Sequence, residues 1–217
     1  MFNRTKSLKK QLSVATARLR ASHRALDSKH KGGELEEYRS AIAEVLRLER
    51  DLSASRDEPY AISCQFPVQW DIGAPLPILM CNDNKTFLTF YIDEPCPDWY
   101  GTYVTSVDPA SPEPASLCLV TFNGCLSSKL GTPNDEGQGG HALAGKGLEG
   151  YTAQIVVNSP WLAEVAKAEN FRCESLNHYV FWFHDSTFEC LAESFNVEVC
   201  FEPMSTLLDR VQAKLLK

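Results

Sequence analysis

The first 58 residues carry apolar side chains at a helical spacing. In the first half, small or apolar residues recur at alternating steps of four and three: Leu8, Leu12, Ala15, Leu19, Ser22 and Leu26. After Lys31-Gly32-Gly33, a second stripe follows: Leu35, Tyr38, Ile42, Val45, Leu46, Leu48 and Leu52. The glycines fit a helix end, and the acids at Glu34, Glu36 and Glu37 fit a helix start. We therefore expect an antiparallel helical hairpin over residues 1–58.

From Pro59 onward the apolar period changes to two, which is typical of strands. Nine runs with this period are bounded by Pro, Gly, Asn or Asp: Tyr60–Phe66, Leu76–Cys81, Thr86–Asp93, Tyr100–Val107, Leu117–Phe122, Tyr151–Val157, His178–His184, Thr187–Glu193 and Asn196–Phe201. The run Asn82-Asp83-Asn84-Lys85 predicts a hairpin turn. Pro160 predicts the start of a helix that ends near Glu169, and Pro203 precedes a last helix to Lys217.

Strands in runs, without regularly alternating helices, are typical of antiparallel α+β proteins. We predict an α+β fold: an N-terminal antiparallel helical hairpin, then a mostly antiparallel β-sheet domain with one internal helix and a C-terminal helix. Composition supports two domains, since residues 1–58 hold 13 basic and 9 acidic residues and residues 59–217 hold 8 and 19. All 12 prolines and all 8 cysteines also lie in the second part, so we place a domain boundary between 58 and 59.

The compartment is inferred from what the sequence lacks. No apolar run approaches the ~20 residues of a membrane helix. The N-terminus leads into basic residues, without an apolar signal segment. The cysteines contain no C-x-x-C pair, which disfavours a closed zinc site. We expect a cytoplasmic protein with reduced thiols and no membrane partner.

Residues 124–150 form a glycine-rich segment that holds eight of the twelve glycines and shows no clear periodicity. Long ordered loops of this kind are often functional. Its candidate ligand-binding residues are Lys129, Asn134, Asp135, Glu136 and Lys146. Residues 140–146 match the spacing G-x-x-x-x-G-K, but Gly147 stands where a nucleotide-binding loop needs Ser or Thr, so we reject that motif.

A second candidate segment is the aromatic run that ends in His184-Asp185-Ser186. Alternation places His178 and His184 on one strand face. If the run folds back at the turn, we expect His184 to approach Glu189, an arrangement that tunes an imidazole for proton transfer. The alternative is a histidine that satisfies a turn, with Asp185 in an ordinary Asx turn.

Together the two segments offer candidate catalytic residues, which are Cys125, His141, His184, Asp185 and Glu189. Cys125 with His141 or His184 would suit thiol catalysis, because an imidazole can generate the thiolate. Two histidines with Asp135 and Glu189 would suit a zinc- or iron-type centre. The same groups can also bind a ligand or a peptide without catalysis. None of these sets has a diagnostic spacing, and the cofactor stays unassigned.

The same segments resemble a group of uncharacterised bacterial proteins. The residues that carry the resemblance are Phe122-Asn123-Gly124-Cys125, Lys129, Gly131-Thr132-Pro133-Asn134-Asp135-Glu136, Gly140-His141, Gly147-Leu148, Asn158-Ser159-Pro160-Trp161 and Phe183 to Cys190. The resemblance covers about residues 60–201 and implies no activity. The chain departs from the group at Ser128 and Ala142, where His and Pro are expected, and loss of a histidine at 128 weakens a metal interpretation.

The N-terminal helix supplies the last functional feature. Residues 1–33 carry nine basic residues and one acid. These basic residues can neutralise phosphates, but no nucleic-acid recognition motif accompanies them. A solvated coiled-coil face, or docking against the acidic second domain, is therefore favoured over nucleic-acid binding. We expect the hairpin to mediate homo-oligomer formation or partner binding. For the whole chain we expect a ligand- or protein-partner-binding module, with a hydrolase-like enzyme using His141 or His184 and either Cys125 or a divalent metal as the alternative.

Overall fold

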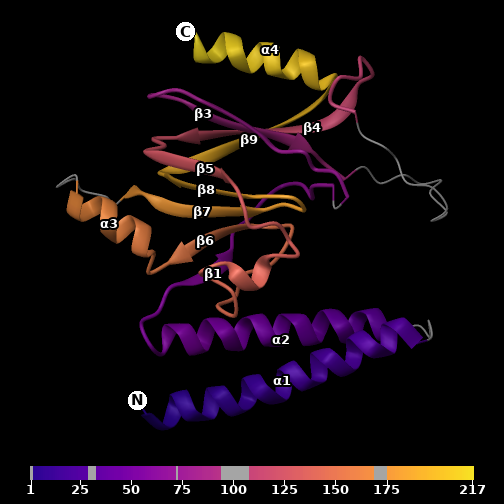
Figure 1. Ribbon diagram of the computed structural model, residues 1–217, viewed down its shortest axis with the longest axis vertical. Helices are drawn as coiled ribbons and strands as arrows, with labels where there is room; N and C mark the ends of the chain where they lie inside the picture. Colours follow the sequence, from indigo (N-terminus) through magenta and orange to yellow (C-terminus); the bar gives the residue numbers. More distant parts are fainter. Residues whose placement is uncertain (1, 29–32, 72, 94–107, 169–174) are drawn as a thin grey trace.

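In the computed structural model, the chain begins with the helical hairpin that its apolar stripes predict. The described residues are 2–28, 33–71, 73–93, 108–168 and 175–217. The two helices are α1 (Phe2–Ser28) and α2 (Glu34–Ala54), which run side by side in Figure 1. Leu8 and Ala15 of α1 are buried against Val45 and Leu48 of α2. Leu35 is 51% exposed and Ala41 is fully buried, so the buried stripe on α2 is offset from the predicted one.

The remaining chain forms two antiparallel sheets. The five-stranded sheet has the order β1 (Tyr60–Ser63), β6 (Ala153–Val157), β7 (Asn177–Trp182), β8 (Thr187–Ala192) and β5 (Ser127–Gly131). The four-stranded sheet has the order β2 (Ile78–Cys81), β3 (Thr86–Tyr91), β4 (Ala115–Asn123) and β9 (Ser194–Glu202). The short internal helix is α3 (Pro160–Ala168) and the C-terminal helix is α4 (Met204–Leu215). The predicted α+β class is confirmed, with an N-terminal helix pair, antiparallel sheets, one short internal helix and a C-terminal helix.

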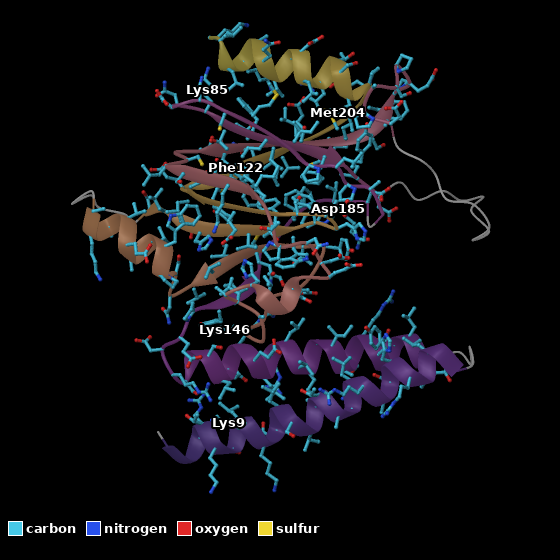
Figure 2. The ribbon with its side chains drawn as sticks, in the orientation of Figure 1. Lys9, Lys85, Phe122, Lys146, Asp185 and Met204 are labelled. Carbon is cyan, nitrogen blue, oxygen red and sulfur yellow. The ribbon has the colours of Figure 1, made fainter. Side chains whose placement is uncertain are left out.

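The two sheets stack face to face around an aromatic core (Figure 1). Phe90 and Phe122 of the four-stranded sheet meet Phe181 and Phe188 of the five-stranded sheet, with Phe122 lying between the sheets in Figure 2. Trp70 fills one end of this core and donates its ring N–H to the carbonyl oxygen of Trp182 at 3.2 Å. Burial of these large side chains supplies much of the driving force for folding.

The outer faces of the two sheets are covered in different ways. Helix α4 lies over the four-stranded sheet, where Met204 and Leu207 are buried against Leu117 and Leu119 (Figure 2). The glycine-rich segment crosses the outer face of the five-stranded sheet instead. Its Leu143 and Leu148 pack with apolar side chains of that sheet: Ala61, Val156, Val180 and Trp182. The loop therefore replaces a helix as the cover of this face.

The loop also joins the helical hairpin to the sheets. The Gly147 N–H donates to Glu49 of α2 at 3.0 Å, and the Arg50 side chain donates to the carbonyl oxygens of Ala61 at 2.9 Å and Gly147 at 3.2 Å. A Cβ on Gly147 would lie 2.5 Å from Arg50 and 2.8 Å from the Ala61 oxygen, and φ is +79°. This junction therefore requires glycine at position 147.

Some of the predicted elements differ from those in the structure, and one lies outside the residues that the structure describes. Strand β5 lies inside the glycine-rich segment, where no strand was predicted, and a short 3-10 helix spans Gln138–Gly140. The strand expected at Tyr100–Val107 lies outside the described residues. The predicted turn at Asn82–Lys85 is confirmed, because it joins β2 and β3. Among the described helices, none is both long and apolar enough to cross a membrane.

Candidate functional site

Glu189 is the centre of a polar cluster on the outer face of the five-stranded sheet, buried except for the exposed Lys129. Lys129 of β5 donates to Glu189 Oε1 at 2.8 Å, and His178 of β7 lies 2.8 Å from Oε2 through Nε2. His141 Nε2, from the glycine-rich loop, is 3.6 Å from Oε1. Burial alone would raise the pKa of Glu189, but the donors His141, His178 and Lys129 outweigh it and hold this pKa well below its ordinary value. Glu189 is therefore a carboxylate.

The hydrogen bonds of His178 link Ser159 to Glu189 in a three-residue chain. Since Glu189 is ionised and can only accept, the proton of His178 sits on Nε2. The other ring nitrogen, Nδ1, is 2.8 Å from Ser159 Oγ. Ser159 Oγ also accepts the N–H of Leu162 at 3.2 Å, which caps helix α3. In the neutral form of the ring with its proton on Nε2, Nδ1 accepts the Ser159 hydroxyl proton; in the imidazolium form, Nδ1 donates to Ser159 Oγ. We call Lys129, His141, Ser159, His178 and Glu189 the Glu189 cluster.

The tautomer of His141 is set by its own loop. The N–H of Leu143 donates to His141 Nδ1 at 3.1 Å, so the ring proton sits on Nε2 and points toward Glu189. A nitrogen that carries a proton has no lone pair for a metal. The part of the chain that the structure describes holds no group of three or more His, Cys, Asp or Glu side chains arranged for a metal ion. His141 therefore accepts a hydrogen bond at Nδ1 and directs Nε2 toward Glu189 Oε1, at 3.6 Å.

A pocket of about 630 Å³ opens above the cluster. Lys129, His141, His178 and Glu189 line it on one side, and hydroxyl-bearing residues extend the polar wall: Ser127, Ser128 and Thr132. Its apolar walls come from Leu143, Val156, Pro160 and Trp161. The Lys129 ammonium lies 5.0 Å from the centre of the Trp161 ring, a cation–π distance. We call this cavity the Glu189 pocket; its volume is within the usual range for small-molecule sites.

A second cluster lies at the turn between β7 and β8. Asp135 Oδ2 is 2.8 Å from His184 Nδ1 and accepts the Tyr151 hydroxyl at 2.8 Å. The Asp135 N–H also donates to the His184 carbonyl oxygen at 2.9 Å. The hydrogen bond from Tyr151, followed by that from His184, lowers the pKa of Asp135, while burial and Asp135 raise the pKa of Tyr151 to about 12. This group, which we call the His184 cluster, fastens the loop to the sheet.

The predicted approach of His184 to Glu189 is wrong. The two strands do fold into the expected hairpin, but their register pairs Val180 with Glu189 and Trp182 with Thr187. His184 therefore lies in the turn, and the nearest same-face histidine to Glu189 is His178, which is diagonally opposite. The single constellation expected from the sequence is divided into two clusters, each of which joins the glycine-rich loop to the hairpin.

Cys125 is separated from the histidines by the sheet itself. It packs against the core between the sheets, with the buried Cys190 as neighbour, whereas Glu189 and His141 lie on the opposite face. The Cys190 thiol, with smaller contributions from Thr86 and the backbone, lowers the pKa of Cys125 to about 7 although burial opposes this. The expected Cys125–His pair is therefore not formed. The six described cysteines are free thiols.

The other predicted binding residues do not reach the Glu189 pocket. Asn134 accepts the Gly137 N–H at 2.9 Å in a local turn, and Glu136 is exposed. The Lys146 carbonyl accepts the Ala61 N–H at 2.9 Å, and Figure 2 shows Lys146 near α2, far from Asp185. The Asp185 side chain is 71% exposed and lies 3.9 Å from His184. Of the predicted set, Lys129, His141 and Glu189 are brought together.

Three residues of the site were missed by sequence reasoning: Ser159, Trp161 and His178. A signal for His178 existed, because a tight turn at residues 183–186 places it diagonally opposite Glu189. Ser159 and Trp161 were named among the residues that carry the resemblance, without a role in the site. The contact between Ser159 and His178 depends on the packing of α3 against β7, for which the sequence carries no local signal.

Comparison of the chain with models of known protein families, with curated proteins and with solved structures gives no match.

Proposed function

We propose that this protein binds a small organic carboxylate in the Glu189 pocket, with the negative group near Lys129 and an apolar body against Trp161. The observation that carries the proposal is the surplus of donors at the Glu189 pocket. Glu189 already accepts from Lys129 and His178 at 2.8 Å, with His141 at 3.6 Å, whereas the Lys129 ammonium uses one of its three N–H groups on it. A ligand that supplies an acceptor is therefore favoured over one that supplies a donor.

The rest of the lining defines the kind of carboxylate. Leu143, Val156 and Trp161 offer apolar surface, so an alkyl or aryl group adds affinity in proportion to the area it buries. Glu164, which is exposed on α3, contributes a negative charge to the rim. This second carboxylate disfavours dianions such as phosphate esters. A monocarboxylate with an apolar chain or ring matches the charge and the shape.

Calorimetric titration of the full-length protein with hexanoate, phenylacetate and hexylamine tests this proposal. We expect both carboxylates to bind and hexylamine, of matched length and opposite charge, to bind at least tenfold more weakly. Lys129→Met, which keeps the apolar stem, should weaken hexanoate binding about 10- to 100-fold, as expected for loss of a charged hydrogen bond. Lys167→Met, in the same region but outside the pocket lining, is the matched control.

Two outcomes would contradict the proposal. One is equal or tighter binding of hexylamine, and the other is hexanoate binding that Lys129→Met leaves unchanged.

A further inference from the structure

Beside the Glu189 pocket, Ser159, His178 and Glu189 form a continuous chain of short hydrogen bonds. Both links measure 2.8 Å, and when the His178 ring is neutral with its proton on Nε2, the donors run from the Ser159 hydroxyl to His178 and from His178 to Glu189. The three residues are 7%, 5% and 8% exposed. They come from three elements, since Ser159 follows β6, His178 lies on β7 and Glu189 lies on β8. A hydroxyl, an imidazole and a carboxylate in this order are the components that activate a serine as nucleophile.

The carboxylate end of the chain is held ready for this role. Lys129 contacts Glu189 Oε1, so Oε2 is free to support His178. When His178 takes up a second proton, the ionised carboxylate stabilises the resulting imidazolium. The base of this hydrogen-bonded chain, His178, therefore has a protonated form that Glu189 stabilises, which is what proton transfer from a hydroxyl requires.

The serine end is placed at a helix N-terminus. Asn158, which precedes it, has φ of +54°, so the chain turns sharply between β6 and α3. The Leu162 N–H is 3.2 Å from Ser159 Oγ, and the first turn of α3 carries partial positive charge. The Leu162 N–H and the partial positive charge of the first turn of α3 both stabilise negative charge that develops at or next to Ser159 Oγ.

We propose that this protein hydrolyses carboxylic esters, with Ser159 as the nucleophile, His178 as the base and Glu189 as the support of His178. The inference rests on the proposed function, since the carboxylate bound in the Glu189 pocket is the acid that such an ester releases. Trp161, Pro160 and His178 line the pocket next to Ser159, so the acyl group would occupy the same apolar walls.

Atoms and protons balance in each step of this hydrolysis. Ser159 Oγ forms a bond to the ester carbonyl carbon while its proton passes to His178 Nδ1. The tetrahedral intermediate breaks its bond to the leaving oxygen, which takes the proton from His178 and departs as an alcohol. Water then attacks the acyl-serine, its proton passes to His178 Nδ1, and that proton returns to Ser159 Oγ as the carboxylic acid leaves.

Two features distinguish the hydrogen-bonded set Ser159, His178 and Glu189 from the Ser–His–Asp triad of known hydrolases. The imidazole faces serine through Nδ1 and the carboxylate through Nε2, the reverse of that triad. Either ring nitrogen can act as the base, because each exchanges a proton while the other is hydrogen-bonded. The Trp161 ring packs edge-on against His178 at 5.2 Å, and Ser159 itself is little exposed, so we expect slow turnover.

A fluorophosphonate probe and p-nitrophenyl hexanoate test the proposal on the full-length protein. We expect the probe to add to Ser159, located by mass spectrometry of the peptides, and hydrolysis of the ester to fall at least about 100-fold in Ser159→Ala. Because Ser159 also caps α3, Ser159→Gly is the second variant, since glycine retains most of the capping effect. Ser205→Ala is the matched control, because Ser205 is an exposed serine of α4 outside the pocket lining.

The outcomes separate this inference from the binding proposal. Hexanoate binding without labelling of Ser159, or hydrolysis retained in both Ser159 variants, overturns the esterase and leaves the carboxylate site intact. Labelling of Ser159 with hydrolysis that depends on it supports the esterase. If Ser159 is labelled and required for hydrolysis but hexanoate does not bind, the esterase proposal stands and the proposal of a carboxylate-binding pocket is rejected.

Discussion

The outer faces of the two sheets differ in what covers them and in what lies beneath. On the four-stranded sheet, helix α4 buries Met204, Leu207 and Val211 against Leu117 and Leu119. On the five-stranded sheet, a glycine-rich loop buries two leucines and leaves a pocket above Lys129, His178 and Glu189. The first face is an apolar interface without a described site, and the second combines apolar contacts with buried, hydrogen-bonded polar groups.

This difference indicates that the two faces have different roles in stability and in binding. A helix on an apolar sheet contributes to folding in proportion to the area it buries. A buried carboxylate with several donors contributes less stability for the same area, because each charged group must first lose its hydration. Retaining such a cluster is the feature expected of a site that binds or reacts. Changes on the α4 face should alter stability alone, and changes on the loop face should alter both stability and binding.

The largest effect should follow from Leu207→Ala on the α4 face. Leu207 is fully buried, and its truncation leaves a cavity that costs about 2–5 kcal/mol of unfolding free energy. Urea denaturation measures this loss, with Thr206→Ala, an exposed neighbour on α4, as control. Hexanoate affinity of the folded protein should not change. A loss of affinity in Leu207→Ala would break the proposed separation of the two faces.

Gly147→Ala tests the junction where the loop meets the hairpin. The added Cβ meets Arg50 and the Ala61 oxygen at a positive φ, so we expect about 2–4 kcal/mol of destabilisation from overpacking and backbone strain. The pocket should loosen with the loop, so hexanoate affinity should fall as well. Gly139→Ala is the control, because a Cβ added there would have no described atom within 4 Å. Equal effects of the two substitutions would show that the junction does not hold the loop.

Glu189→Gln tests the charge at the centre of the cluster. The pKa of Glu189 is lower in the folded protein than in the unfolded chain, so folding favours the ionised form. Its stabilisation is fully present above the unfolded pKa of about 4.3 and is lost as the pH falls through the folded pKa. We expect Glu189→Gln to cost about 2 kcal/mol at pH 7 and progressively less below pH ~4. Urea denaturation across pH measures this, and a pH-independent difference would contradict the assignment.

The smallest effect should come from His184→Ala in the His184 cluster. Its side chain is 41% exposed, and its main contact is one hydrogen bond to Asp135, so we expect a loss of about 1 kcal/mol. Asp185→Ala, at the same turn but 71% exposed, should stay within about 0.5 kcal/mol of the wild-type protein. Thermal unfolding measures both. Hexanoate affinity that falls in His184→Ala as much as in Lys129→Met would show that the His184 cluster belongs to the site.

The sequence predicted the elements that depend on near neighbours in the chain. The seam from Leu8 to Leu19, the alternation in β3 and β4, and the turn at Asn82–Lys85 follow from side-chain period and turn chemistry. Strand β5 escaped prediction because Ser127–Gly131 carries one leucine and no apolar alternation. Its extended form comes from hydrogen bonding to β8, which is a distant partner.

The chemistry of the site was only partly readable in the same way. Glu189, His141 and Lys129 could be selected as candidates because of their residue types and their place in unusual segments. Which histidine meets Glu189 depended on strand register, and a shift along β7 exchanges His184 for His178. Ser159 joined the cluster because α3 packs beside β7, an arrangement set by contacts between distant segments.

By itself, then, the sequence determined the class of the fold, the positions of the helices and of the strands with clear alternation, and the residue types available for chemistry, because these depend on local period and composition. The tertiary structure alone decided which strands pair, which face the glycine-rich loop covers and which side chains meet. The physical reason is that Leu143 and Leu148 must be buried somewhere, and only the assembled sheet offers the apolar surface that accepts them. Their burial places His141 above Glu189 and creates the pocket.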